Sequence, residues 1–212
     1  MAAAGPEAVQ VAVFAKAPVP GEVKTRLVPL LGPADAAELH ATLVRRAVAT
    51  ARNAGLGPVS LWCMPDTGHP FFAACAADSG ASLHAQTGGH LGERMARAFG
   101  HLLASGPALL VGADCPGLTP ADLREAAAAL AGHDAVFQPA EDGGYVLVGL
   151  SRPAPSVFEG IRWGEPTVMA GTRERLREAG LRWKEMPERW DVDRPEDYRR
   201  LLASGLLAET PR

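Results

Sequence analysis

The sequence lacks the short motifs that mark several large classes of enzyme. It has no eight-residue pattern ending in Gly-Lys-Ser/Thr, which excludes a P-loop nucleotide triphosphatase, and no G-x-G-x-x-G dinucleotide-binding fingerprint. No serine lies in a G-x-S-x-G turn, so a serine hydrolase of that type is not expected. No H-E-x-x-H pair is present, and we interpret the histidines as ordinary structural residues.

The sequence also has few cysteines and a small net charge. The three cysteines, Cys63, Cys75 and Cys115, are far apart and form no C-x-x-C pair, so neither a disulfide framework nor a zinc site is indicated. A reduced, cytosolic setting is the default for such a chain. The formal charge of −3 argues against recognition of nucleic acid or an anionic membrane by bulk electrostatics. It leaves room for a local phosphate-binding site.

Long apolar runs are absent as well. No stretch approaches the roughly 18 uninterrupted apolar residues of a membrane span. Residues 1–7 carry neither a basic segment nor a sustained apolar run, so no secretory signal is expected. We therefore expect a soluble cytoplasmic protein with no membrane span. The sequence predicts no particular oligomeric state.

What the sequence does contain is an alternation of strand and helix patterns. Strands are predicted at 9–15, 59–64, 82–86, 109–112, 134–138, 144–150 and 181–186. Helices are predicted at 33–54, 70–79, 93–104, 119–131, 166–179 and 195–203. With 212 residues, 47% of them hydrophobic, this order predicts one α/β domain over 1–212 with a mostly parallel sheet.

One carboxylate follows a buried strand directly. Asp114 comes two residues after the strand that ends at 112, and Pro116 prevents that strand from continuing. Thr119 can then cap a helix whose first position is filled by Pro120. Open α/β sheets bind ligands at the carboxyl ends of their strands, so Asp114 is a candidate functional residue. An Asp that only forms the turn is the alternative.

A basic loop rich in proline follows the first strand. Lys16, Lys24 and Arg26 lie around Gly21, between residues that prevent a regular helix. Cations on a stiffened loop could hold phosphate oxygens, arginine through its planar fork and lysine as a point charge. An ordinary solvated loop is the alternative interpretation.

Further acids and glycines lie at the ends of other predicted elements. Asp142 lies in a Glu-Asp-Gly-Gly turn, and Asp191 and Asp193 precede the last helix. Acids at the ends of separate elements could converge on Mg²⁺ or Mn²⁺, which sites for phosphate transfer hold with one or two carboxylates. Capping of the last helix is the alternative role for Asp193. In the glycine-rich segment 87–94, Arg94 could reach a phosphate; a flexible loop followed by an amphipathic helix is the alternative. Trp163 lies in a loop where it could line a pocket, and ordinary packing is the alternative.

Five segments carry a resemblance to a known family. They are 14–27 (FAKAPVPGEVKTRL), 91–95 (LGERM), 112–119 (GADCPGLT), 139–145 (PAEDGGY) and 191–197 (DVDRPED). Over about 9–202, the chain resembles the small bacterial GT-A-like proteins known as DUF2064. It departs from most GT-A glycosyltransferases in having Asp-Cys-Pro where they have D-x-D, and from the nucleotidyltransferases in replacing their G-x-G-x-R opening by the proline loop.

The resemblance implies a fold and a set of roles. The fold is that of nucleotide-diphospho-sugar transferases, a Rossmann-like three-layer sandwich with a mostly parallel mixed sheet. The implied phosphate-binding residues are Lys16, Gly21, Lys24, Arg26 and Arg94; the implied catalytic acids are Asp114 and Asp142; the implied ligands of Mg²⁺ or Mn²⁺ are Asp114 and Asp193, with Asp191 as substitute; and the implied acceptor side is Gly143, Gly144, Tyr145 and Trp163.

Three functions follow from this resemblance. The preferred one is a metal-dependent transferase with a nucleotide-activated donor, namely an NDP-sugar glycosyltransferase acting on a small-molecule acceptor. The first alternative is a nucleotidyltransferase that joins an NTP to a small phosphorylated or acidic acceptor and releases pyrophosphate. The second is a non-catalytic nucleotide-binding protein. The sequence names neither the base, the sugar nor the acceptor.

Overall fold

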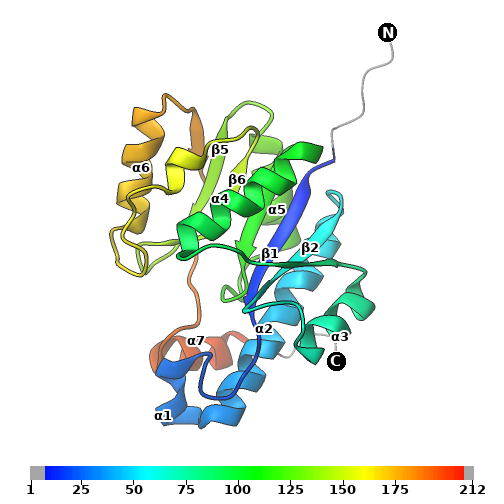
Figure 1. Ribbon diagram of the computed structural model, residues 1–212. Helices are drawn as coiled ribbons and strands as arrows, with labels where there is room; N and C mark the ends of the chain where they lie inside the picture. The colour runs from blue at the N-terminus through cyan, green and yellow to red at the C-terminus, as the bar shows by residue number, and fades with distance from the viewer. Residues whose placement is uncertain (1–7, 208–212) are drawn as a thin grey trace.

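A single mixed sheet forms the centre of the molecule. The computed structural model describes residues 8–207 (Figure 1). Its strands are β1 (Gln10–Lys16), β2 (Val59–Met64), β3 (Ser82–Ala85), β4 (Ala108–Gly112), β5 (Ala135–Pro139), β6 (Tyr145–Leu150) and β7 (Trp183–Glu185). Their order is β3-β2-β1-β4-β6-β5-β7, and β6 alone runs antiparallel to its neighbours β4 and β5 within the described sheet. This confirms the predicted mostly parallel, mixed sheet of the GT-A-like fold.

Helices cover both faces of the sheet. The α-helices are α1 (Val28–Leu31), α2 (Pro33–Ala54), α3 (Pro70–Ser79), α4 (Leu91–Leu102), α5 (Pro120–Ala129), α6 (Val168–Glu178) and α7 (Pro195–Ser204). One buried cluster packs α2, α3 and α5 against one face, and a second packs α4 and α6 against the other. Figure 1 shows α4 crossing the front of the sheet. β1 is central, and Val11, Ala12 and Val13 are fully buried because both of its faces are covered.

The chain reverses its direction of travel across the sheet between β1 and β4. From β1 it steps outward to β2 and β3, and then returns to add β4 on the other side of β1. Such a switch point leaves a crevice outside the carboxyl ends of the two strands, where open α/β sheets bind their ligands. The proline loop after β1 and the turn after β4 both begin at this crevice.

A third cluster brings the end of the chain to the start of α2. Leu27, Leu39, Val192 and Leu201 are buried together where α1, α2 and α7 meet. Figure 1 shows α7 beside α1 and the first turns of α2, although some 160 residues separate them in sequence. This packing carries residues 190–194 back to the crevice between β1 and β4.

Most element boundaries agree with the sequence patterns to within a few residues. α2 and α3 begin at the prolines that were predicted to start them, and Thr119 caps α5 in a capping box with Asp122. Helix α1 and three short 3-10 helices were not predicted from the sequence; the latter are Thr25–Leu27, Leu103–Ser105 and Pro155–Phe158. In the part of the chain that the structure describes, no helix combines the length and apolar character needed to cross a membrane.

Candidate functional site

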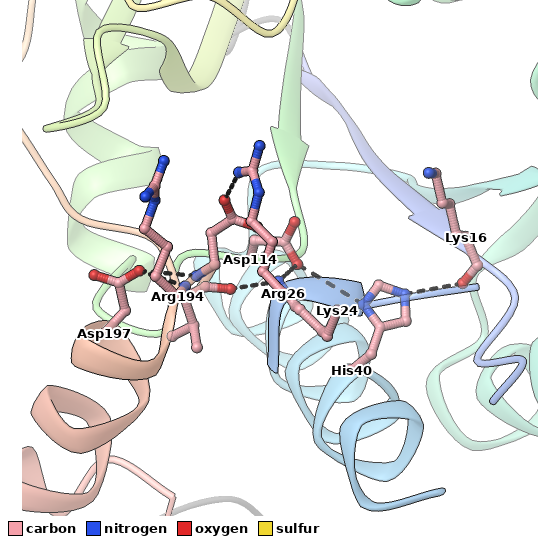
Figure 2. Close-up of polar contacts among 9 residues, drawn as sticks. Lys16, Lys24, Arg26, His40, Asp114, Arg194 and Asp197 are labelled. Atoms are coloured by element: carbon pink, nitrogen blue, oxygen red, sulfur yellow. Dashed lines mark hydrogen bonds and ion pairs between the residues drawn. The ribbon is translucent and has the colours of Figure 1, made fainter. Parts of the chain in front are cut away.

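Lys24 joins three segments that are distant in sequence. Its Nζ forms an ion pair with the Asp114 carboxylate and donates a hydrogen bond of 2.6 Å to the carbonyl oxygen of Val192. The backbone N–H of Val192 in turn donates to the carbonyl oxygen of Asp114, at 2.9 Å. The loop after β1, the turn after β4 and the segment before α7 therefore meet at one ammonium group (Figure 2).

Lys24 is held in an uncommon conformation at this junction. Its φ of +49° lies in the left-handed region, where non-glycine residues are infrequent. Its side chain is only 5% exposed, whereas that of Asp114 is 48% exposed. A buried ammonium thus supports a carboxylate that remains open to solvent.

His40 of α2 completes the surroundings of Asp114. Its Nε2 lies 3.1 Å from the carbonyl oxygen of Lys16, and its Nδ1 lies 3.8 Å from the Asp114 carboxylate. Partial burial opposes ionisation of Asp114, but the charge of Lys24 and the His40 imidazole hold the pKa of this carboxyl well below its usual range. Asp114 is therefore an anion at neutral pH. The interpretation of the histidines as ordinary missed His40, because no motif marks a histidine in the middle of a long helix.

A second ion pair lies at the rim of the same crevice. Arg26 pairs with Asp193, and both side chains are largely exposed. Asp193 does not cap α7, because Asp197 accepts hydrogen bonds from the backbone N–H groups of Asp193 and Arg194. The capping role considered for Asp193 is therefore wrong, and its carboxylate is turned toward Arg26.

These groups line a pocket of about 520 Å³, which we call the cationic pocket. Its charged lining residues are Lys16, Lys24, Arg26, Arg94, Asp114, Asp193 and Glu22. Arg94 Nε is buried with no hydrogen-bond partner among residues 8–207. Gly21 is not on the wall; its φ of +84° turns the loop at an exposed position. The structure thus brings together four of the five predicted phosphate-binding residues.

A second cavity, of about 260 Å³, adjoins the cationic pocket. The two share Phe14, Leu91 and Gly112 as lining residues. Most of its wall is apolar or aromatic, and its charged members are Asp142, Glu165 and Asp191, so we call it the acidic cavity. No lysine, arginine or histidine of the described chain lines it. Gly144, Tyr145 and Trp163 lie on this wall as well, whereas Gly143 does not.

Two glycines hold the walls of the acidic cavity together. A Cβ on Gly143, whose φ is +89°, would lie 2.0 Å from the carbonyl oxygen of Pro166. A Cβ on Gly92 would lie 2.6 Å from Nε1 of Trp163. The turn between β5 and β6 and the start of α4 can approach the loop before α6 this closely only because glycine has no side chain.

The acids of the two sites influence one another. Burial, together with the nearby carboxylates of Asp142 and Asp114, raises the pKa of Asp191 to about 6. Within residues 8–207, no three His, Cys, Asp or Glu side chains are grouped closely enough to form a metal site by themselves. Mg²⁺ and Mn²⁺ sites in phosphate transfer need fewer, because substrate oxygens and water complete the shell. The half-exposed Asp114 carboxylate and the neighbouring Asp191 fit that requirement.

Comparisons with known proteins agree with this fold. The family described as "Uncharacterized protein conserved in bacteria (DUF2064)" matches residues 34–165. A protein of Desulfovibrio desulfuricans G20, described as a candidate nucleotide-diphospho-sugar transferase, is 30% identical, with coverage of 95% of this chain and 97% of that chain and a TM-score of 0.81. No curated protein matches the sequence significantly.

More distant solved structures share the fold alone. The inositol-1-phosphate CTP transferase of T. maritima is 12% identical, with 96% of each chain covered and a TM-score of 0.62. A manganese complex of the Rv0371C protein of Mycobacterium tuberculosis H37Rv is 20% identical, with 92% of this chain and 99% of that chain covered and a TM-score of 0.56.

Proposed function

The chain belongs to the DUF2064 family, and we propose that it is a divalent-metal-dependent transferase whose nucleotide-activated donor is an NDP-sugar. The observation that carries the proposal is the cationic pocket, which gathers Lys16, Lys24, Arg26 and Arg94 at the switch point of the sheet. Its volume of about 520 Å³ falls within the range of small-molecule sites, and its charge suits a diphosphate. The description of the 30%-identical relative as a candidate nucleotide-diphospho-sugar transferase supports the same assignment.

In this proposal the basic residues bind and orient the diphosphate. Arg26 and Arg94 bind phosphate oxygens, while Lys24 fixes Asp114 and adds its charge to the pocket. Asp114 holds Mg²⁺ or Mn²⁺, with Asp191 or Asp193 as its partner ligand. When bound, the metal supplies neutralisation of the charge that develops on the leaving phosphate.

The acidic cavity receives the acceptor in this proposal. Asp142 lies on its wall and is fixed by a hydrogen bond of 2.9 Å from the backbone N–H of Gly144 to its carboxylate. Such a carboxylate can take the proton of an acceptor hydroxyl as it attacks. Tyr145 and Trp163 line the cavity around that hydroxyl, and Gly143 shapes it indirectly, because it lets the turn pack closely against Pro166. Positioning and electrostatics supply most of the rate, so no protein nucleophile is needed.

Charge in the acidic cavity favours glycosyl over nucleotidyl transfer. A nucleotidyltransferase of the kind considered above must bind a phosphorylated or acidic acceptor, which a wall carrying Asp142, Glu165 and Asp191 repels. A neutral sugar hydroxyl meets no such cost.

Nucleotidyl transfer remains the second candidate because of one observation. The four cations of the cationic pocket suit a triphosphate at least as well as a diphosphate. Release of pyrophosphate from an NTP, without consumption of any NDP-sugar, would favour this reaction. A protein that binds nucleotides independently of metal and turns none over would instead be the non-catalytic binder.

The test is a thermal-shift screen of NTPs, NDPs and NDP-sugars, each with and without Mg²⁺ or Mn²⁺. A ligand at 100 times its Kd stabilises the folded state by about 2.7 kcal/mol, which raises the Tm of a protein of this size by roughly 5–10 °C. Asp114→Asn should abolish the metal-dependent part of the shift. Asp78→Asn, the same change at an exposed position of α3, should leave the shift intact. If Asp114→Asn responds to nucleotide and metal as the wild type does, the proposal is wrong.

A further inference from the structure

Gln86 lies on the wall of the cationic pocket and has no role in the phosphate site described above. It follows β3 directly, and its backbone N–H donates to the carbonyl oxygen of Cys63 at 2.9 Å, which continues the pairing of β2 and β3. Its side chain reaches across the end of β2 toward β1. The position of its carboxamide is therefore set by three adjacent strands.

The carboxamide can adopt only one orientation there. Its Nε2 donates to the carbonyl oxygen of Trp62 at 2.8 Å and to that of Ala15 at 3.3 Å. Both partners are acceptors, so the nitrogen must face them and the oxygen must point the other way. No hydrogen bond from the described chain reaches Gln86 Oε1, and this atom is accessible to solvent. The structure thus presents a fixed acceptor at the edge of the pocket.

The surroundings of this acceptor differ from those of the phosphate site. Phe14, Met64 and Leu91 line the pocket with apolar surface that suits a flat ring better than a charged group. A carbonyl oxygen cannot donate to phosphate, so it has no favourable contact with the diphosphate itself. Adjacent strands of a sheet are about 4.8 Å apart. Asp114 follows β4, and the carboxamide of Gln86 lies at the ends of β1 and β2, which are the first and second strands away from β4 in the sheet. That separation leaves room for a ribose between the phosphates and the carboxamide.

We infer that Gln86 Oε1 accepts a hydrogen bond from an N–H group of the donor's nucleobase and thereby selects bases that present such a group. The inference rests on the proposed function, because it assumes a nucleotide with its phosphates beside Lys24 and Arg26. It applies equally to an NDP-sugar and to an NTP. A ribose hydroxyl offers a donor too, and the experiment separates the two sources.

The experiment measures Kd by titration calorimetry in Mn²⁺ for the four common ribonucleoside diphosphates and for counterparts in which the Watson–Crick N–H groups are methylated. For the tightest-binding base, methylation should weaken binding of the wild type about fivefold or more, since the acceptor, once the bound base covers it, is left without a partner. The 2′-deoxy counterpart should show no loss that depends on Gln86.

Two variants separate the acceptor from a general steric effect of the methyl group. Gln86→Met removes both donor and acceptor, whereas Gln86→Lys keeps N–H donors for Ala15 and Trp62 but removes the acceptor. In both variants, the Kd of the methylated nucleotide should be no more than about twofold above that of the unmethylated one. The added charge of lysine affects both nucleotides equally and therefore cancels in this ratio. The far-ultraviolet CD spectrum and Tm of each variant establish that it is folded.

An unchanged ratio in a folded variant overturns the inference while leaving the proposed function in place. A 2′-deoxy penalty that disappears in the variants overturns it as well, in favour of the ribose. Failure of every nucleotide to bind the wild type refutes the proposed function, and the inference with it.

Discussion

Removal of the Lys24 ammonium tests the central contact of the site. Lys24→Met keeps most of the aliphatic stem but removes the partner of Asp114 and the donor to the Val192 carbonyl. The three segments that meet at this group would then be joined only by the backbone hydrogen bond from Val192 to Asp114. We expect a folded but less stable protein.

The size of the effect follows from the exposure of the two partners. Breaking a fully buried ion pair costs about 3–5 kcal/mol, whereas exposed pairs contribute about 0–1 kcal/mol. Lys24 is buried but the Asp114 side chain is 48% exposed, so solvent screens the carboxylate that is left behind. An intermediate loss of about 2 kcal/mol is expected, which corresponds to a fall in Tm of roughly 4–8 °C.

The assay is urea denaturation at pH 7, with Arg26→Met as matched control. Arg26 lies on the same loop and also pairs with an aspartate, but its side chain is 60% exposed and that of Asp193 is 41% exposed, so its removal should cost less than about 1 kcal/mol. The reasoning is refuted if the two variants are equally stable.

The same variant should change the pH dependence of stability. In the wild type, the pKa of Asp114 is lowered in the folded state from an unfolded value of about 3.9. The stabilisation is therefore present above about pH 4 and is lost as the pH falls below it. In Lys24→Met the part of this lowering that comes from Lys24 disappears, whereas the part that comes from His40 remains. The difference in unfolding free energy between the two proteins should accordingly narrow as the pH is lowered from 7 to 3.

Three further predictions concern other parts of the fold. Gly92→Ala places a Cβ 2.6 Å from Nε1 of Trp163 and 2.7 Å from the carbonyl oxygen of Phe158, so it should cost about 1–3 kcal/mol and expose the indole to a fluorescence quencher. The folded-state pKa of Asp191 is raised to about 6, so in the absence of divalent ions the free energy of unfolding should decline as the pH rises from about 4 to 6. Asp191→Asn should remove this decline and stabilise the protein by about 1–2 kcal/mol at pH 7, which urea denaturation measures. Thr119→Ala removes the N-cap of α5 and should lower the unfolding free energy by about 1 kcal/mol in the same assay.

Local pattern predicted the parts of the site whose geometry is local. Asp114 was expected after a strand, ahead of a helix capped by Thr119 and begun by Pro120, and the structure has this arrangement. The alternation of strands and helices along the chain and most helix boundaries also followed from periodicity, caps and glycine stops. Each of these features depends on residues within a few positions of one another, which a single sequence displays directly.

Pairing across the chain could not be read in this way. The loop lysine, Lys24, was expected to hold phosphate, but the structure shows that it also anchors Asp114, 90 residues away, and Val192, 168 residues away. His40 and Gln86 carry no motif, and they matter because the N-terminal half of α2 and the end of β3 lie beside the crevice. Asp191 and Asp193 are only two positions apart, and the sequence did not indicate that Asp191 lines the acidic cavity whereas Asp193 lines the cationic pocket.

The sequence by itself therefore determined the elements, their order, the family and the kinds of charged residue at the strand ends. Only the tertiary structure decided which charged residues pair, which are buried and which face a pocket. It also placed the acidic cavity next to the cationic pocket. The physical reason is that strand and helix patterns report short-range periodicity, whereas ion pairing and burial depend on how α7 and the loop after β1 pack against the end of the sheet.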